Sequence, residues 1–229
     1  MIILSPISEF LFNFSKKYSR KNLYEFLIDG IDKYYRNSYK AISIGAGGPI
    51  KKLLNRQNVE FKEIDIDQKR NPDYVCDIEK MDIFEDDSVD IIFCLEVLEH
   101  VRNPFNAVKE IKRILKPGGC IIGSVPFVFP LHEEPYDYFR YTRYGLLNLF
   151  EDFECLELKE RNSYLESTYV ILLRLVNIGS KKQRLFGALL FPLNLCLLPF
   201  ILFFNFLIKN KQSTTGYYFV FRKLEKSKL

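Results

Sequence analysis

The chain has 229 residues, of which 48% are hydrophobic and 27% are charged, and its formal net charge is +4. This size and composition suit one globular domain of ordinary size and exclude a disordered chain. The small net charge, without a long basic run, argues against a nucleic-acid-binding protein.

The numbers and positions of the cysteines and histidines limit the disulfides and metal sites that the chain could form. The chain has two histidines and five cysteines that lie singly in apolar stretches, with no Cys-x-x-Cys pair. We therefore expect buried thiols, a reducing compartment and no metal site. The first residues, MIILSPISEFLFNFSKK, lack the basic start of a secretory signal. We expect a cytosolic protein, or one held on the cytosolic face of a membrane.

In chain order, residues 7–37 carry apolar residues at helical spacing and predict one or two helices that pack on a sheet or cover a ligand. Strands are predicted at 40–44 and 60–65, joined by the glycine turn 45–48 and a helix. Glycines allow a close approach of the backbone to a ligand, and the helix points its N–H groups there. Asp65, about 20 residues beyond the turn, is where a carboxylate meets a ribose diol in nucleotide-binding βαβ units.

The next part of the chain predicts a doubly wound parallel sheet. A short strand is expected at 74–76 after a crossover with room for only a turn, and a buried strand at 88–94. A helix from Pro104 to Leu115 is ended by Lys116-Pro117-Gly118-Gly119, and a strand follows at 120–125. Short connections between such strands favour one α/β sheet.

At this point an ordered set of motifs matches a known family: SIGAGG at 43–48, EIDID at 63–67, the segment 76–101 ending in VLEHV, and KPGG at 116–119. Residues 41–125 resemble class I S-adenosylmethionine-dependent methyltransferases of the small-molecule kind called type 11. The resemblance implies a Rossmann-like seven-stranded sheet, mostly parallel with an antiparallel last strand, and S-adenosylmethionine as cofactor. It divides the single domain 1–229 into N-terminal helices at 1–39, a cofactor-binding core at 40–160, apolar helices at 164–211 and the last strand at 216–223.

The resemblance also implies roles for single residues. Gly45 and Gly47 would let the backbone approach the methionine part of the cofactor, and Asp65 would bind the ribose hydroxyls. Ser43 takes the place of an acidic residue, common in the family, that helps hold the methionine ammonium. The residues expected to bind the cofactor include Ser43, Gly45, Ala46, Gly47, Asp65 and Ile66. Asp77 and Ile78 are expected at the adenine, and Cys94 and Leu95 at the sulfonium end.

The segment 126–142, rich in proline and aromatic residues, is the predicted acceptor side. It resembles the H-x-x-P-x-D-x-x-R-x-T pattern of methyltransferases found with cell-surface polysaccharide genes. His132 is the candidate base, because neutral imidazole is available near its reference pKa of about 6.5. Asp137 is expected to orient this base or to bind acceptor hydroxyls. Candidate substrate-binding residues are Arg140, for an anionic group, and Tyr136 and Tyr138, for stacking on a sugar.

The alternative for the same segment is structural. In it, Asp137 pairs with Arg140, Thr142 caps a helix at 143–150, and His132 bonds to backbone. For the neighbouring Glu99 and His100, a structural role is favoured.

Towards the end of the chain, a strand is predicted at 153–160 and an apolar helix at 164–178. The uncharged run 185–208 is long enough to cross a membrane, but Pro192 and Pro199 interrupt it. Both flanks are basic and the last strand must rejoin the sheet, so we predict a hairpin turning near the prolines and half-buried in one leaflet. A helix pair packed on the domain is the alternative.

The sequence thus predicts methyl transfer to a hydroxyl of a small molecule, glycan or glycolipid at a membrane surface. A lipid or quinone precursor is the rival acceptor. Outside the enzymes, the alternative function is an adapter that keeps the methyltransferase fold but has no activity. Ser43 is the feature that favours this alternative. An NAD-dependent oxidoreductase is disfavoured, because Ile50 occupies the third glycine position of a dinucleotide fingerprint.

Overall fold

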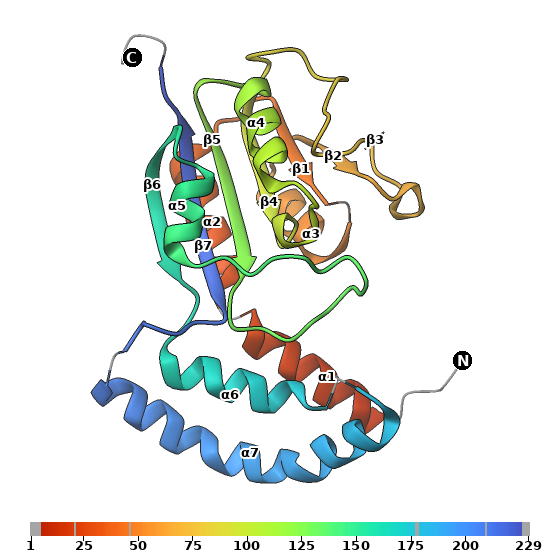
Figure 1. The fold of residues 1–229 in the computed structure, drawn as a ribbon, viewed down its shortest axis with the longest axis vertical. Coiled ribbons are helices and arrows are strands. Elements are labelled where there is room, and N and C mark those ends of the chain that lie inside the picture. The colour runs from red at the N-terminus through yellow and green to blue at the C-terminus, as the bar shows by residue number, and fades with distance from the viewer. Residues whose placement is uncertain (1–5, 21, 46, 177–178, 209, 226–229) are drawn as a thin grey trace. The chain divides into compact units, whose positions relative to one another are not determined.

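The structure is a computed structural model that describes residues 6–20, 22–45, 47–176, 179–208 and 210–225 (Figure 1). The chain divides into two compact units. We call them the sheet unit, which comprises Tyr24–Pro126, Glu133–Lys159 and Tyr217–Leu229, and the helical unit, which comprises Met1–Leu23, Phe127–His132 and Glu160–Gly216.

Within the described residues the strands form one seven-stranded sheet in the order β3-β2-β1-β4-β5-β7-β6. The pairs among β1 to β5 are parallel, and β7 runs against β5 in Figure 1. This arrangement confirms the predicted fold class. The strands are β1 (Ala41–Ile44), β2 (Phe61–Asp65), β3 (Tyr74–Val75), β4 (Val89–Leu95), β5 (Leu115–Pro126), β6 (Phe153–Glu160) and β7 (Gly216–Lys223).

Helices cover this sheet because each has one apolar side. From α2, Phe26 stacks on Tyr218 of β7 with ring centroids 4.9 Å apart. Gly30 of the same helix lies so near β5 that a Cβ there would be 3.0 Å from Ile122, so the predicted packing of this helix on the sheet is confirmed. The covering helices are α2 (Leu23–Tyr34), α3 (Gly48–Arg56), α4 (Pro104–Ile114) and α5 (Arg143–Leu149).

The start of β5 and the end of the helix expected at 164–178 differ from the prediction by several residues. β5 begins at Leu115, directly where α4 ends, so the segment 116–119 belongs to the strand and not to a turn before it. A shift of register between Val89 and Ile91 of β4, and the positive φ of 80° at Gly118, keep this irregular stretch in the sheet. The helix predicted at 164–178 is α6 (Tyr164–Arg174), and residues 177–178 lie outside the described residues.

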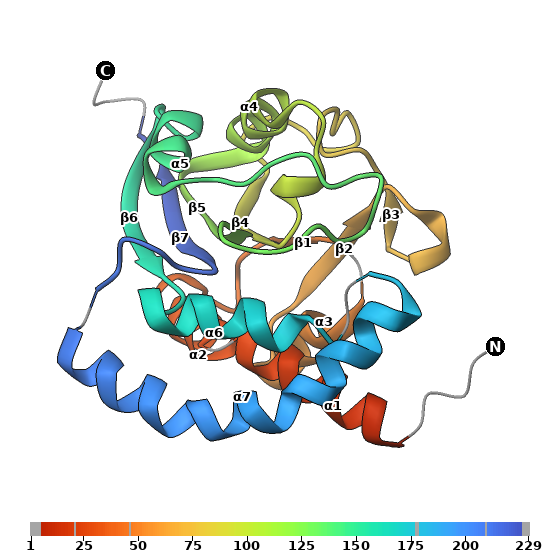
Figure 2. The same ribbon diagram turned by 60° about the horizontal axis from the view of Figure 1, so that its bottom comes forward.

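The helical unit is built from α1 (Pro6–Ser19), α6 and α7 (Lys181–Ile208). Figure 2 shows α7 running beside α6 and α1. Their shared core contains Leu11 of α1, Tyr169 and Leu173 of α6, and Phe191 of α7. A Cβ on Gly187 would lie 2.5 Å from the Leu175 carbonyl, so this glycine permits α7 to approach the end of α6.

The predicted hairpin at 185–208 is wrong. α7 is one helix of 28 residues that continues through Pro192 and Pro199. A proline inside a helix costs about 3 kcal/mol, because it removes a hydrogen bond and crowds the preceding turn. Here a stripe of buried residues at heptad-like spacing (Gly187, Phe191 and Asn194) holds the helix against α1 and α6 across the first proline. We infer that this packing offsets the local loss.

The expectation that the cysteines are buried is correct for Cys94 and Cys120 only. Cys76 is half-buried, and Cys155 and Cys196 are exposed. The sequence places the last two in apolar stretches, but Cys155 points outward from β6 and Cys196 lies on the exposed side of α7.

Candidate cofactor-binding site

The glycine turn follows β1 at the carboxyl edge of the sheet. Gly45, Gly47 and Gly48 have positive φ values of 88°, 80° and 70°, which other residues adopt at a cost. A Cβ on Gly47 or Gly48 would meet nothing within 4 Å. The turn therefore presents bare backbone to open space, as a cofactor approached by main-chain atoms requires. Ala46 lies outside the described residues.

A buried carboxylate holds this turn from the neighbouring strand. Glu63 of β2 has a side chain only 2% exposed and accepts the Gly47 N–H at 2.7 Å. It also forms an ion pair with Lys51 of α3. Ser43, predicted at the cofactor, is buried in β1 opposite Glu63 in the parallel register.

Asp65 lies at the carboxyl end of β2, where the prediction requires a carboxylate. It is 9% exposed, and its Oδ1 accepts the N–H of Asp67 at 2.8 Å. Oδ2 lies 3.8 Å from Nε of Arg70. The next side chain, Ile66, is 70% exposed. The turn and Asp65 thus lie at the ends of adjacent parallel strands, as the βαβ geometry for a ribose-containing ligand requires.

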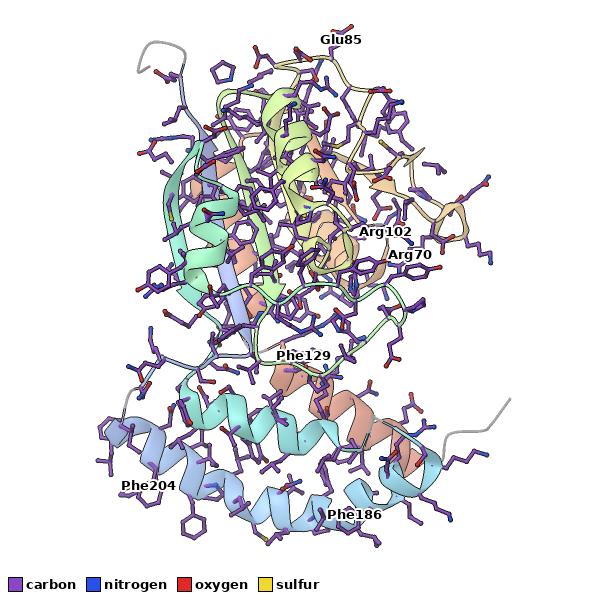
Figure 3. All side chains as sticks on the ribbon, in the orientation of Figure 1. Arg70, Glu85, Arg102, Phe129, Phe186 and Phe204 are labelled. Atoms are coloured by element: carbon purple, nitrogen blue, oxygen red, sulfur yellow. The ribbon has the colours of Figure 1, made fainter. Side chains whose placement is uncertain are left out.

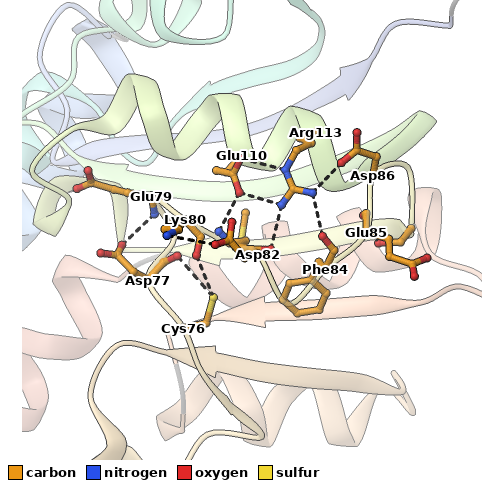
Figure 4. A network of polar contacts seen from close by, with 12 residues as sticks. Cys76, Asp77, Glu79, Lys80, Asp82, Phe84, Glu85, Asp86, Glu110 and Arg113 are labelled. Carbon is orange, nitrogen blue, oxygen red and sulfur yellow. Dashed lines mark hydrogen bonds and ion pairs between the residues drawn. The ribbon is translucent and has the colours of Figure 1, made fainter.

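The adenine side is predicted at Asp77 and Ile78, which begin the loop between β3 and β4. Asp77 Oδ1 accepts the Glu79 N–H at 2.9 Å, and Ile78 is buried. Arg113 of α4 fastens the loop by donating to the carbonyls of Met81 and Phe84 at 2.9 and 2.8 Å (Figure 4).

Glu110 completes this fastening. Its Oε2 accepts the N–H of Met81 at 2.8 Å, and both of its oxygens accept from Arg113. These bonds to Arg113 lower the pKa of Glu110 below its usual value.

The sulfonium side is predicted at the end of β4. Cys94 is fully buried and Leu95 is 8% exposed, and burial raises the pKa of the Cys94 thiol far above its usual value. The next residue, Glu96, was not predicted. It has a left-handed φ of 57° and accepts the Ser124 hydroxyl at 2.7 Å. Positive φ at a residue other than glycine costs energy and is common at functional sites, and the place of Glu96 directly after a buried strand is the signal that could have found it.

A cavity of about 790 Å³ in the sheet unit is not this site. Its lining includes Ala41 and Val89, the first residues of β1 and β4, together with Lys51 and Glu63. The residues predicted to bind the cofactor do not line it, because they lie at the opposite, carboxyl ends of the strands.

Comparison with known proteins identifies the fold around these residues. The model of the type 11 family, described as a methyltransferase domain, matches residues 42–123. This range contains the glycine turn, Asp65, the fastened loop and the end of β4. Residues 42–123 are therefore similar to the methyltransferase domain of this family.

Solved structures agree with this domain. A S-adenosylmethionine-dependent methyltransferase from Archaeoglobus fulgidus shares 16% identity and a TM-score of 0.58, covering 93% of this chain and 99% of that one. Geranyl diphosphate C-methyltransferase from Streptomyces coelicolor A3(2), solved with Mg²⁺, geranyl diphosphate and S-adenosyl-L-homocysteine, shares 12% identity and a TM-score of 0.58, covering 88% and 80%. A search of curated proteins gave no match. With the family model, these similarities support the predicted cofactor, S-adenosylmethionine.

On the acceptor side of the methyltransferase domain, the structural alternative for Asp137 and Arg140 is observed. Both Arg140 amino groups donate to the two Asp137 oxygens at 2.6 Å, and the side chain of Asp137 is 2% exposed. The ion pair raises the pKa of Arg140. Thr142 accepts the Gly145 N–H at 3.0 Å and caps α5 as predicted.

The two predicted stacking tyrosines differ in their surroundings. The Tyr138 hydroxyl accepts from Nε of Arg102 at 3.1 Å, so this ring is held in place. Tyr136 is 57% exposed, and its carbonyl lies 2.8 Å from Nδ1 of His100. The carbonyl of Glu99 accepts the N–H of Tyr138 at 2.8 Å. The structural role favoured for Glu99 and His100 is therefore to fasten this segment.

His132, the predicted base, belongs to the helical unit, whereas Asp137 belongs to the sheet unit. The His132 ring is half-buried and meets the Phe129 ring edge-on, with centroids 5.4 Å apart. The Arg174 guanidinium lies 4.7 Å from the Phe129 centroid, and its Nη2 donates to Ser19 at 2.6 Å. Figure 3 labels Phe129. The chain Ser19–Arg174–Phe129 thus sets the position of the imidazole within its unit.

Proposed function

We propose that this protein is a S-adenosylmethionine-dependent methyltransferase acting on a hydroxyl of a small molecule, glycan or glycolipid at a membrane surface. The observation that carries the proposal is the open glycine turn beside Asp65, at the carboxyl edge of the matched domain. Backbone N–H groups and a carboxylate at that edge suit a ligand with a ribose and an amino-acid part.

Methyl transfer to oxygen forms a C–O bond as the C–S bond of the sulfonium breaks. S-adenosylmethionine supplies the electrophilic methyl group when bound. The chain supplies orientation of the two reactants and a group that accepts the hydroxyl proton. We assign that group to His132. Asp137 is assigned a structural role, because Arg140 occupies both of its oxygens.

A lipid precursor is the second candidate acceptor. Its support is the likeness in fold to a methyltransferase that acts on geranyl diphosphate and the exposed apolar helix α7. The difference is chemical: a hydroxyl acceptor yields an ether, whereas a carbon acceptor yields a C–C bond.

The test is transfer from methyl-labelled S-adenosylmethionine to an envelope extract that contains both glycans and lipids. We expect a labelled product that survives mild base, as an ether does and an ester does not. His132→Asn should bind S-adenosylmethionine normally and slow transfer roughly 10²–10⁴-fold, the usual contribution of a general base. Cofactor binding without transfer to any fraction would favour the adapter, and NAD binding would favour an oxidoreductase.

The membrane part of the proposal rests on α7. Among the described helices it is the one long and apolar enough to cross a membrane. Only 17% of its most apolar 18-residue stretch is buried. Bulky side chains lie exposed along its length, among them Phe186 and Phe204, which Figure 3 labels. Leu189, Phe200 and Phe203 are exposed on the same helix. Soluble monomers rarely expose so continuous an apolar surface.

The ends of the inserted segment argue for a helix lying in the interface. Tyr164 donates its N–H to the Asn210 carbonyl at 2.9 Å, so the start of α6 lies beside the chain that follows α7. α6 has 11 residues and is about 16 Å long, too short to cross a hydrocarbon core of about 30 Å. α7 shares its core with α1 and α6, so a crossing would carry Lys16, Lys17 and Arg174 into hydrocarbon.

We therefore propose that α7 lies along an anionic bilayer with its exposed side in the headgroup region. The basic residues Lys181, Lys182 and Arg184 at its start add electrostatic attraction. This position would bring a membrane-held acceptor to the protein and place the protein on the cytosolic face.

A further inference from the structure

We propose that Glu63 is a positioning residue that holds the glycine turn in its cofactor-binding conformation. Its carboxylate reaches from β2 to the turn, where Oε1 accepts the Gly47 N–H at 2.7 Å. Glu63 is 2% exposed and lies two residues before Asp65 on the same strand. It acts through the turn and does not itself contact the cofactor.

The need for such a group follows from the start of α3. Gly47 is the N-cap of this helix, and its missing side chain leaves the first turn without a side-chain cap. The first N–H groups of a helix have no partner within the helix, and a negative charge is stabilising there. Glu63 thus supplies from the neighbouring strand a carboxylate that the cap residue itself cannot provide.

The charge of Glu63 is compensated by neighbouring groups. A buried carboxylate is costly unless it is paired and hydrogen-bonded. Lys51 of α3 forms the ion pair and Gly47 gives the hydrogen bond. The N–H of Glu63 itself donates to Asp73 at 2.8 Å, which fixes the strand at this residue. One side chain therefore ties β2, the turn and α3 together.

The parallel register adds a second observation. Ser43 of β1 is the register partner of Glu63, and it too is 2% exposed. Side chains of register partners in a parallel sheet point to the same face. A small residue at 43 leaves room for the carboxylate from β2. We infer that one side-chain acceptor is needed at this place and that a carboxylate on either strand can supply it.

The consequence for binding is preorganisation. A turn of three positive-φ glycines has many conformations open to it when nothing holds it. Ordering such a segment on binding reduces affinity, whereas a segment already held does not incur that loss. Removal of the side-chain acceptor at position 63, as in Glu63→Ala, should weaken binding of S-adenosylmethionine about tenfold or more, even though every atom that contacts the ligand is retained.

The experiment compares four variants by calorimetric titration with S-adenosylmethionine and with S-adenosylhomocysteine. Glu63→Ala should weaken both about tenfold or more, and Glu63→Gln, which keeps an acceptor for Gly47, should stay within about threefold of wild type. The exchange Ser43→Glu with Glu63→Ser, which moves the carboxylate to β1, should recover most of the affinity. Glu60→Ala, an exposed glutamate just before β2, is the matched control and should change nothing.

Hydrogen exchange at the Gly47 amide separates positioning from general stability. We expect this amide to be protected in the free wild type and in the Gln variant, and to exchange faster in Glu63→Ala while amides of β4 stay protected. Unchanged affinity in Glu63→Ala, or an unprotected Gly47 amide in wild type, would overturn the proposal. So would failure of the Ser43→Glu exchange to recover affinity when that variant is folded.

The proposal rests on the proposed cofactor, and the two can fail separately. If wild type binds no S-adenosylmethionine, the cofactor assignment fails. The exchange of the Gly47 amide still decides whether Glu63 holds the turn.

Discussion

Two carboxylates two residues apart on β2 have different surroundings and hence different tasks. Glu63 is enclosed by Gly47 and Lys51. Asp65 ends the strand, where its Oδ1 accepts the Asp67 N–H and its Oδ2 lies 3.8 Å from Nε of Arg70. Alternate residues on a strand point to the same face. Position along the strand, and not the type of residue, therefore distinguishes the group proposed to hold the backbone from the group predicted to bind the ligand.

Asp65→Ala should weaken binding of S-adenosylmethionine roughly 10- to 100-fold. Hydrogen bonds from ribose hydroxyls to a carboxylate contribute about 1.5–3 kcal/mol each at most, and the substitution removes the acceptor. Calorimetric titration measures the effect, with Asp67→Ala, an exposed aspartate in the following turn, as the control. Wild-type affinity in Asp65→Ala would show that β2 does not carry the ribose site.

Glu110→Gln should reduce the acid sensitivity of the fold. The bonds from Arg113 lower the folded-state pKa of Glu110. Its contribution is therefore present above the unfolded pKa of about 4.3 and is lost as pH falls through the lower folded pKa. We expect Glu110→Gln to be less stable than wild type at pH 7, with the difference shrinking below about pH 4. Urea unfolding at both pH values measures this, and a difference that grew in acid would contradict it.

At the scale of elements, the acceptor segment is fastened by pairs within the sheet unit. Asp137 and Arg140 form the strongest of the pairs described above, because both oxygens and both amino groups take part. A bidentate pair restricts geometry as well as adding energy. Of the two alternatives predicted for these residues, the structure shows the structural pair. Binding of an acceptor by Arg140 stays a prediction.

Arg140→Met should destabilise the fold by about 3–5 kcal/mol, because it leaves the buried Asp137 carboxylate without its ion partner. The double variant Asp137→Leu with Arg140→Met should recover much of this loss, since neither charge is then buried alone. Thermal unfolding of the single and double variants measures the difference. A double variant no more stable than Arg140→Met would show that the pair is not the main determinant.

Pro192→Ala should raise the melting temperature. The proline lies inside a continuous α7, where alanine would restore the missing hydrogen bond and is favoured by up to about 3 kcal/mol. Thermal unfolding in detergent measures the change. A turn at this position would give the opposite sign, because alanine would then remove a residue that the turn favours.

At the scale of the whole molecule, we predict that the exposed apolar side of α7 binds the protein to a membrane. We expect the full chain to float with vesicles of phosphatidylglycerol and phosphatidylcholine, and to remain bound at high salt. Each buried Leu or Phe side chain contributes about 1.5–3 kcal/mol, and salt screens only the electrostatic part.

Flotation of a triple variant tests the face directly. The variant changes to Gln three exposed residues, Leu189, Phe200 and Phe203, whose exposed fractions are 71%, 61% and 60%. We expect this variant not to float. The matched control changes three exposed apolar residues of the sheet unit, Ile83, Phe105 and Tyr144, to Gln and should float like wild type. Labelling of the native Cys196 from the far side of the vesicle would contradict the interfacial position. Self-association without vesicle binding would indicate that a second copy covers the face.

The sequence alone determined the architecture of the sheet unit. Ranges such as 153–160 and 216–223 match β6 and β7 to the residue. Apolar runs of strand length separated by Gly, Pro and Asn are local signals, and the order of motifs from SIGAGG to KPGG fixes the spacing of the strands. The glycine turn and Asp65 were predictable for the same reason, since both follow directly from a strand end.

Only the tertiary structure decided which side chains of different helices and strands contact one another. The ion pair of Glu63 joins two elements that the sequence separates by 12 positions, and no local pattern distinguishes it from a solvated Glu–Lys pair. The same holds for α7: two prolines in an apolar run predict a break, yet burial against α1 and α6 outweighs the local cost. Local propensity is limited to about 3 kcal/mol per residue even for proline, so packing between distant segments overrules it wherever enough apolar surface is buried.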